Sequence, residues 1–166
     1  MAKIGELDFY GVSILNRDFG GEKFGPESRQ FSIEIVDPEL AQKLTNEGVR
    51  LWQSNYVVND EPPRVYMNIR VDFRYGDCDI IMITPEGNAV KLGPNNVQEL
   101  NKAWIKNADL HVSLNSYERP GRKGITAYCK TLVVTLMSKT EREEVMAERG
   151  PVNNPIREKY SKYFGD

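Results

Sequence analysis

The side chains in this sequence are better suited to holding a ligand than to catalysing a reaction. His111 is the only histidine, which excludes a site built on two histidines. Asp72, Asp77 and Asp79 form the closest acidic group, but they surround an expected turn and lack the fixed spacing of a calcium-binding loop. No glycine motif that cradles phosphates or exposes a nucleophile is present in the sequence. We therefore expect no enzyme activity, no cofactor and no metal.

The clearest alternation in the chain brings an aromatic ring together with basic and amide side chains. Between Arg64 and Arg74, every second residue is apolar, as expected for a strand with one face toward a core. The opposite face carries Tyr66, Asn68 and Arg70 between these two arginines. We predict that this face binds a ligand.

A second basic cluster lies at an expected hairpin tip, residues 119–124. The tip contributes Arg119, Arg122 and Lys123. Tyr117 precedes it, and Tyr128 and Lys130 follow it. Single-stranded nucleic acid is bound by grooves that pair cations for phosphates with aromatic faces for bases, and both clusters have this composition.

The polar loop at residues 17–28 and the residue after it contain a further group with two alternative roles. Phe19 and Phe24 lie near Arg17, Lys23 and Arg29, among glycines. Exposed phenylalanines beside these cations could stack on bases. The same rings could instead fill the end of a barrel, and the sequence leaves both alternatives open.

Composition limits the class of protein. The 166 residues carry a net charge of −2, but residues 64–130 hold ten Lys and Arg against seven Asp and Glu. A central region with this excess can bind phosphates locally in a mildly acidic protein. The sequence shows no membrane-spanning run and no signal peptide at its start, and Cys78 and Cys129 suit a reducing compartment. We expect a cytoplasmic protein with buried, inert thiols and no membrane partner.

The order of expected elements indicates a mainly β protein. Residues 64–136 read as three strands, a helix and two strands, which is the order of a five-stranded Greek-key OB-fold barrel with a helix between strands 3 and 4. An N-terminal hairpin and a short helix occupy residues 7–48, with one strand at 7–16 and the helix running from Asp37 to Gly48. In an alternative assignment, that hairpin supplies the first two barrel strands and residues 78–92 are an insertion.

We expect one binding domain at residues 1–138 and a charged C-terminal tail at 139–166. The tail has few apolar residues and two Pro-containing breaks, which favours flexibility. A helical turn or two is expected at residues 141–148.

Several segments resemble a known family. Residues 119–131 (RPGRKGITAYCKT) resemble the C-terminal signature of bacteriophage single-stranded DNA-binding proteins, in which a glycine-rich tip leads into G-[IV]-x-A-Y-L-K-T. Three earlier segments, at residues 16–31, 37–49 and 105–110, also resemble family motifs in the same order. The resemblance covers about residues 8–136. It implies an OB-fold that coats single-stranded DNA during phage replication or recombination.

The chain departs from this family at two positions before the tip, where Asn115 and Tyr117 replace the tyrosine and tryptophan that relatives often carry. We therefore expect fewer stacking contacts and more reliance on charge. The expected contacts to DNA, without strong sequence preference, come from these residues: Phe19, Phe24, Arg29, Arg64, Tyr66, Asn68, Arg70, Arg74, Tyr117, Arg119, Arg122, Lys123, Tyr128 and Lys130.

The tail could recruit replication or recombination proteins, as the C-terminal peptides of many single-strand binders do. An alternative function is that of a virion or scaffold protein with an OB-like barrel whose tail docks a partner. Oligomeric state, binding-site size and the choice between DNA and RNA stay open.

Overall fold

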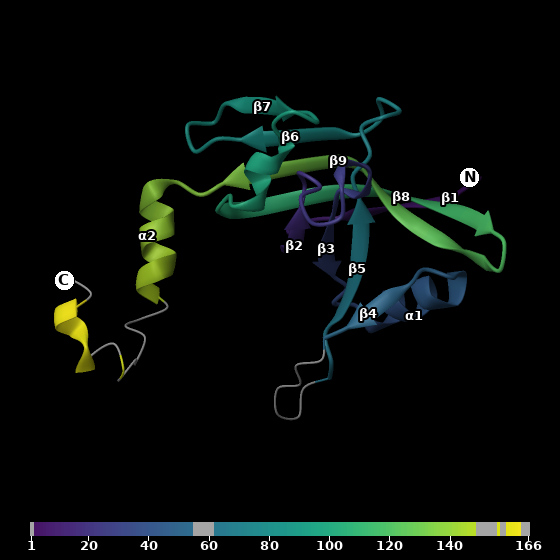
Figure 1. The fold of residues 1–166 in the computed structure, drawn as a ribbon, viewed down its shortest axis with the longest axis horizontal. Coiled ribbons are helices and arrows are strands. Elements are labelled where there is room, and N and C mark those ends of the chain that lie inside the picture. Colours follow the sequence, from purple (N-terminus) through teal and green to yellow (C-terminus); the bar gives the residue numbers. More distant parts are fainter. Residues whose placement is uncertain (1, 55–61, 149–155, 157–158, 164–166) are drawn as a thin grey trace. The chain divides into compact units, whose positions relative to one another are not determined.

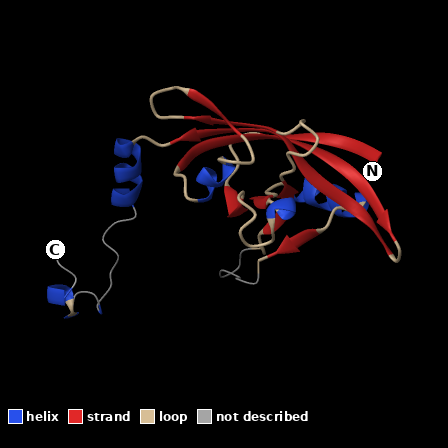
Figure 2. Cartoon of the chain, turned by 45° about the horizontal axis from the view of Figure 1, so that its top comes forward, coloured by secondary structure: helices blue, strands red, loops and turns tan. Residues whose placement is uncertain are grey.

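The computed structural model describes residues 2–54, 62–148, 156 and 159–163, and divides the chain into two units, Met1–Leu136 and Met137–Asp166. The first unit is built mainly from strands (Figures 1 and 2). They are β1 (Ala2–Phe9), β2 (Ile14–Asp18), β3 (Gln30–Glu34), β4 (Leu51–Gln53), β5 (Val65–Arg70), β6 (Asp79–Ile83), β7 (Ala89–Leu92), β8 (Ile105–Arg119) and β9 (Arg122–Leu136). The first unit also contains α1 (Pro38–Glu47) and 3-10 helices at Pro26–Ser28 and Val97–Asn101.

The strands form one mixed sheet in the order β1-β8-β9-β5-β3-β2. β5 and β9 run parallel, and the other neighbours on this path are antiparallel. β1 and β2 lie at opposite ends of the path, yet only residues 10–13 separate them in the chain. Because so short a connection spans at most about 18 Å, less than the width of six adjacent strands, the sheet has to curl back on itself. This is the arrangement of an OB-fold, a partly open barrel.

The N-terminal strands belong to the curled sheet. Phe31 and Ile33 of β3 pair with Ile69 and Met67 of β5, and all four side chains are buried. The β6–β7 hairpin joins the sheet along the second half of β9, where Ile80 pairs with Leu132. The pairing therefore agrees with the second assignment, in which the barrel starts with the N-terminal strands and residues 78–92 are an addition. A barrel core confined to residues 64–136 is corrected accordingly.

The expected single strand at residues 7–16 is two strands, because the chain turns between them. Gly11 has a φ of 62°, and its N–H donates to the Asp109 carboxylate at 3.0 Å. The Val12 N–H donates to the Ala108 carbonyl at 3.0 Å. The turn lets β1 pair with β8 while β2 pairs with β3.

The core lies inside the curl and comes from alternate strand positions, as the sequence predicts. Met67 and Ile69 of β5 are buried, whereas Asn68 and Arg70 between and beyond them are exposed. The polar face of β5 therefore lies on the outside of the sheet.

Helix α1 begins and ends where the sequence predicts. The Asp37 carboxylate accepts a hydrogen bond from the Glu39 N–H at 3.0 Å, and Gly48 ends the helix with a φ of 105°. The predicted helix between the third and fourth barrel strands is a single 3-10 segment that buries Val97 and Leu100.

The second unit contains α2 (Lys139–Glu148), within which the expected turns lie, and a 3-10 helix at Ser161–Tyr163. Ser138 caps α2, because its hydroxyl accepts from the Glu141 N–H at 3.1 Å and its own N–H donates to the Glu141 carboxylate at 3.2 Å. Among the described residues, none of the helices has the length and apolar composition to cross a membrane.

Candidate nucleic-acid interface

A groove of about 380 Å³ lies on the outer side of the sheet, over β3, β4 and β5. We call it the central groove, and its lining residues are Asn16, Lys23, Phe24, Gln30, Ser32, Trp52 and Asn68. The lining combines two large aromatic side chains, one cation and four polar groups. This is the composition that single-stranded nucleic acid needs from a binding surface.

The aromatic wall of the central groove is Trp52, which is not among the site residues predicted from the sequence. Its indole ring stacks on Tyr66, with centroids 4.5 Å apart and planes 25° apart. Tyr66 is thereby covered and only 9% exposed. The prediction that Tyr66 itself offers a stacking face is corrected, because its ring supports Trp52 instead. The alternation of inward Val49 and Leu51 with outward Trp52 was the signal that could have identified it.

The loop after β2 forms the opposite wall of the groove. The carboxylate of Asp18 is buried and accepts hydrogen bonds from the N–H groups of Lys23 and Phe24, each at 3.2 Å. Hydrogen bonds of this kind stabilise a buried carboxylate. Asp18 therefore fixes the conformation of the loop that places Lys23 and Phe24 at the groove. Phe24 is 62% exposed and available for stacking.

Phe19, in the same loop, has the other of the two roles left open. It is fully buried and stacks on Phe31, with centroids 5.1 Å apart. A ring without exposed surface offers no face to a base, so Phe19 belongs to the core and leaves the set of candidate contacts.

Arg70 and Tyr128 extend the surface from β5 onto β9. The two residues are direct partners in the parallel pairing of these strands, and paired residues share a face of a sheet. Gln30 of β3 pairs with Arg70 on the other side. Arg70 is exposed, and no hydrogen bond or ion pair to its guanidinium is found within the described residues. Its charge contributes to lowering the pKa of the Asp72 carboxyl, but its N–H groups are open to a phosphate.

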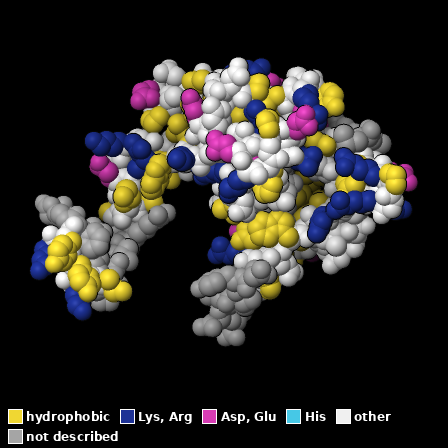
Figure 3. All heavy atoms as spheres, in the orientation of Figure 1, with side chains coloured by type: hydrophobic (Ala, Val, Ile, Leu, Met, Phe, Trp, Pro, Cys, Tyr) yellow, Lys and Arg dark blue, Asp and Glu magenta, His cyan; other side chains and the backbone are white. Residues whose placement is uncertain are grey.

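The β8–β9 hairpin carries the predicted basic tip. Arg119, Arg122 and Lys123 are exposed, and Lys and Arg side chains gather over this hairpin in Figure 3. Tyr117 pairs with Gly124, and a Cβ on Gly124 would lie 2.8 Å from the Tyr117 hydroxyl oxygen. The tyrosine ring therefore lies across the glycine, which shields one side of that ring.

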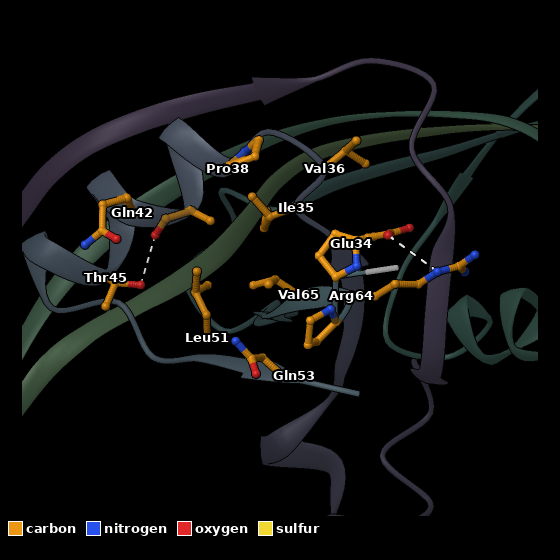
Figure 4. A pocket seen from close by; sticks show the side chains of 13 residues that line it. Glu34, Ile35, Val36, Pro38, Gln42, Thr45, Leu51, Gln53, Arg64 and Val65 are labelled. Carbon is orange, nitrogen blue, oxygen red and sulfur yellow. Dashed lines mark hydrogen bonds and ion pairs between the residues drawn. The ribbon is translucent and has the colours of Figure 1, made fainter. Parts of the chain in front are cut away.

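Arg64 lies away from the central groove, at a second pocket of about 760 Å³. Figure 4 shows this pocket among Ile35, Val65, Leu51 and residues of α1, with Arg64 facing Glu34. The Arg64 guanidinium is 3.9 Å from the Glu34 carboxylate. Leu51 and Val65 line this pocket, whereas Trp52 lines the central groove, and the two hollows share no lining residue.

Three other predicted cations have partners within the protein. Arg74 donates two side-chain hydrogen bonds to Asp72, at 3.0 and 2.8 Å, and these bonds lower the pKa of the Asp72 carboxyl. Lys130 pairs with Asp77 at 2.5 Å. Arg29 donates to the carbonyls of Pro26 and Pro94, at 3.2 and 3.1 Å. A phosphate would have to compete with these partners, so we rank the three cations below Arg70 and the hairpin tip.

Cys78 and Cys129, distant in sequence, are both buried, and no disulfide joins them. The neighbouring thiol lowers the pKa of Cys78 and raises that of Cys129, to which burial adds. His111 lies between Asp8, at 2.5 Å, and Glu6, at 3.5 Å. Across the described part of the chain, no cluster of three or more acidic, histidine or cysteine side chains could hold a metal.

Known proteins with the same fold bind single-stranded DNA. The single-stranded DNA-binding protein of bacteriophage Enc34, truncated at its C-terminus, superposes with a TM-score of 0.52 at 13% identity, over 81% of this chain and 88% of that chain. The same phage protein in complex with single-stranded DNA gives a TM-score of 0.50 at 14% identity, with the same coverage. At this identity the likeness shows the fold.

No curated protein matches the sequence. A family model described as "Putative phage ssDNA-binding domain" matches residues 1–163. With almost the whole chain matched, this protein belongs to the phage single-stranded DNA-binding domain family.

Proposed function

We propose that this protein binds single-stranded DNA across the outer face of β3, β4 and β5, between the loop after β2 and the tip of the β8–β9 hairpin. OB-folds bind oligonucleotides on this part of the barrel and grip them with the corresponding two loops. The observation that carries the proposal is the central groove, where Trp52 and Phe24 offer rings beside Lys23.

In this proposal, aromatic side chains bind the bases and cations bind the phosphates. Bases stack on Trp52 and Phe24, and Tyr128 and Tyr117 extend the aromatic surface toward the hairpin. Phosphates are held by exposed cations along this path, which are Lys23, Arg70 and, at the hairpin tip, Arg119, Arg122 and Lys123. Because every base has a face on which it can stack, the binding tolerates any sequence and needs no chemical step.

The protein would coat single strands during phage DNA replication and recombination, in the cytoplasm of the host. The second unit supplies exposed apolar and aromatic side chains for contacts with other replication or recombination proteins. Ile156, Tyr160 and Tyr163 are 71%, 44% and 72% exposed.

Quenching of tryptophan fluorescence tests the proposed site. The chain has two tryptophans, and Trp104 is 36% exposed and lines none of the pockets described above. We expect oligo-dT to quench the fluorescence of a Trp104→Phe variant, in which Trp52 is the only fluorophore of this kind. The Trp52→Phe variant should bind with little quenching. Equal quenching in the two variants would place the DNA elsewhere.

A further inference from the structure

Asn68 lies at the floor of the central groove, and its side-chain oxygen already accepts two hydrogen bonds. Its Oδ1 accepts a hydrogen bond from the Ser32 hydroxyl at 2.7 Å and another from the Trp52 indole N–H at 2.9 Å. Ser32 is 2% exposed and lies on the neighbouring strand, whereas Asn68 is exposed. The amide is therefore anchored from two directions and still reaches the groove.

These contacts fix which end of the amide points outward. An indole N–H can only donate a hydrogen bond, so the atom of Asn68 that faces it has to be the oxygen. The Nδ2 amino group lies at the other end of the planar amide, and no described residue accepts a hydrogen bond from it. Two N–H donors are thus held in one orientation beside the ring of Trp52.

Three of the other groups that line the groove are less suited to reading a base. The Ser32 hydroxyl directs its proton to Asn68, and the Gln30 amide donates to the Ser28 carbonyl at 3.3 Å. Lys23 carries a flexible charge that suits a phosphate. Asn68 is a neutral donor whose orientation is fixed by its hydrogen bonds with Ser32 and Trp52.

We propose that the amino group of Asn68 donates a hydrogen bond to a carbonyl oxygen on the edge of a base that lies in the central groove. Thymine, with two such oxygens, is the base that fits this donor best. The inference rests on the proposed function. It adds a modest base preference to a surface that otherwise binds DNA through stacking and charge.

The test uses full-length protein and two oligonucleotides of equal length. One is oligo-dT, and in the other every thymine is replaced by difluorotoluene, which keeps the shape of thymine and lacks its carbonyl acceptors. Asn68→Asp retains an oxygen for Trp52 and Ser32 but replaces the donor with a second acceptor. Asn16→Asp is the matched control, because Asn16 lines the same groove and the variant adds the same charge. Its φ of 48° is one that Asp tolerates.

We expect Asn68→Asp to lower the preference for oligo-dT over the isostere by about 3- to 10-fold, the range of one net hydrogen bond. Asn16→Asp should weaken binding of both oligonucleotides by the same factor and leave the preference unchanged. The inference is overturned if both variants leave the preference at the wild-type value. Failure of the proposed function looks different, because the wild-type protein would then bind neither oligonucleotide at low salt.

Discussion

The indole ring of Trp52 lies against the phenol ring of Tyr66 at a centroid distance of 4.5 Å, and its N–H is held by Asn68. One ring is buried beneath the other, so the outer ring is presented to the central groove on a rigid base. A preorganised ring loses little conformational entropy when a base stacks on it.

Trp52→Ala should therefore weaken binding of oligo-dT by about 10-fold or more, since stacking contributes roughly 1–3 kcal/mol per base. Fluorescence anisotropy with a labelled oligonucleotide measures this change. Trp104→Ala is the control and should bind like the wild type. Equal reductions in affinity in the two variants would contradict a special role for Trp52.

The two phenylalanines of the loop after β2 should respond in opposite ways to the same substitution. Phe24→Ala removes an exposed ring, so it should lower DNA affinity and leave the melting temperature nearly unchanged. Phe19→Ala removes a fully buried ring and should lower the free energy of unfolding by about 3–5 kcal/mol. Anisotropy and thermal denaturation of both variants test the pair, and a stability loss in Phe24→Ala would show that its ring packs in the core.

The Trp52–Tyr66 pair shows how much of the site the sequence could predict. Within β5, residues 65–70 of the expected strand at 64–74, the alternation correctly separates the core face from the polar face, because strand geometry sets it locally. The same pattern places Tyr66 on the polar face but says nothing of what covers it. Its partner Trp52 comes from β4, and that pairing is a tertiary contact.

The basic residues show a similar limit. Arg64, Arg74 and Arg70 look equivalent in the sequence, yet only the first two have ion-pair partners among the described residues. Partners of a cation depend on which acidic side chains the fold brings near. The helix caps at Asp37 and Gly48 were predictable because their hydrogen bonds lie within the segment itself.

The hairpin tip should contribute through charge. Replacing Arg122 and Lys123 together by Gln should make the salt dependence of binding shallower, by about 0.7 in the log–log slope for each phosphate that the variant no longer neutralises. A matched control replaces Lys91 and Lys102, two exposed lysines outside the proposed path, by Gln. A slope equal to that of the wild type in the tip variant would exclude the tip from the interface.

The Asp72–Arg74 pair should make a pH-dependent contribution to stability. Hydrogen bonds from Arg74 hold the pKa of Asp72 below its ordinary value, so the ionised form is favoured in the folded protein. The contribution is complete above the unfolded pKa, about 3.9, and is lost as the pH falls through the lower folded pKa. Asp72→Asn should thus lower the melting temperature slightly at pH 7 and less at pH 2.5. An equal difference at both pH values would contradict this assignment.

The most direct test of the central claim compares oligo-dT with a duplex of the same length, in a salt titration of the full-length protein. We predict tighter binding of the single strand at every salt concentration, with affinity falling linearly on a log–log plot by about 0.7 per phosphate neutralised. Equal affinity for the two DNAs, or single-strand binding that does not change with salt, would contradict the account.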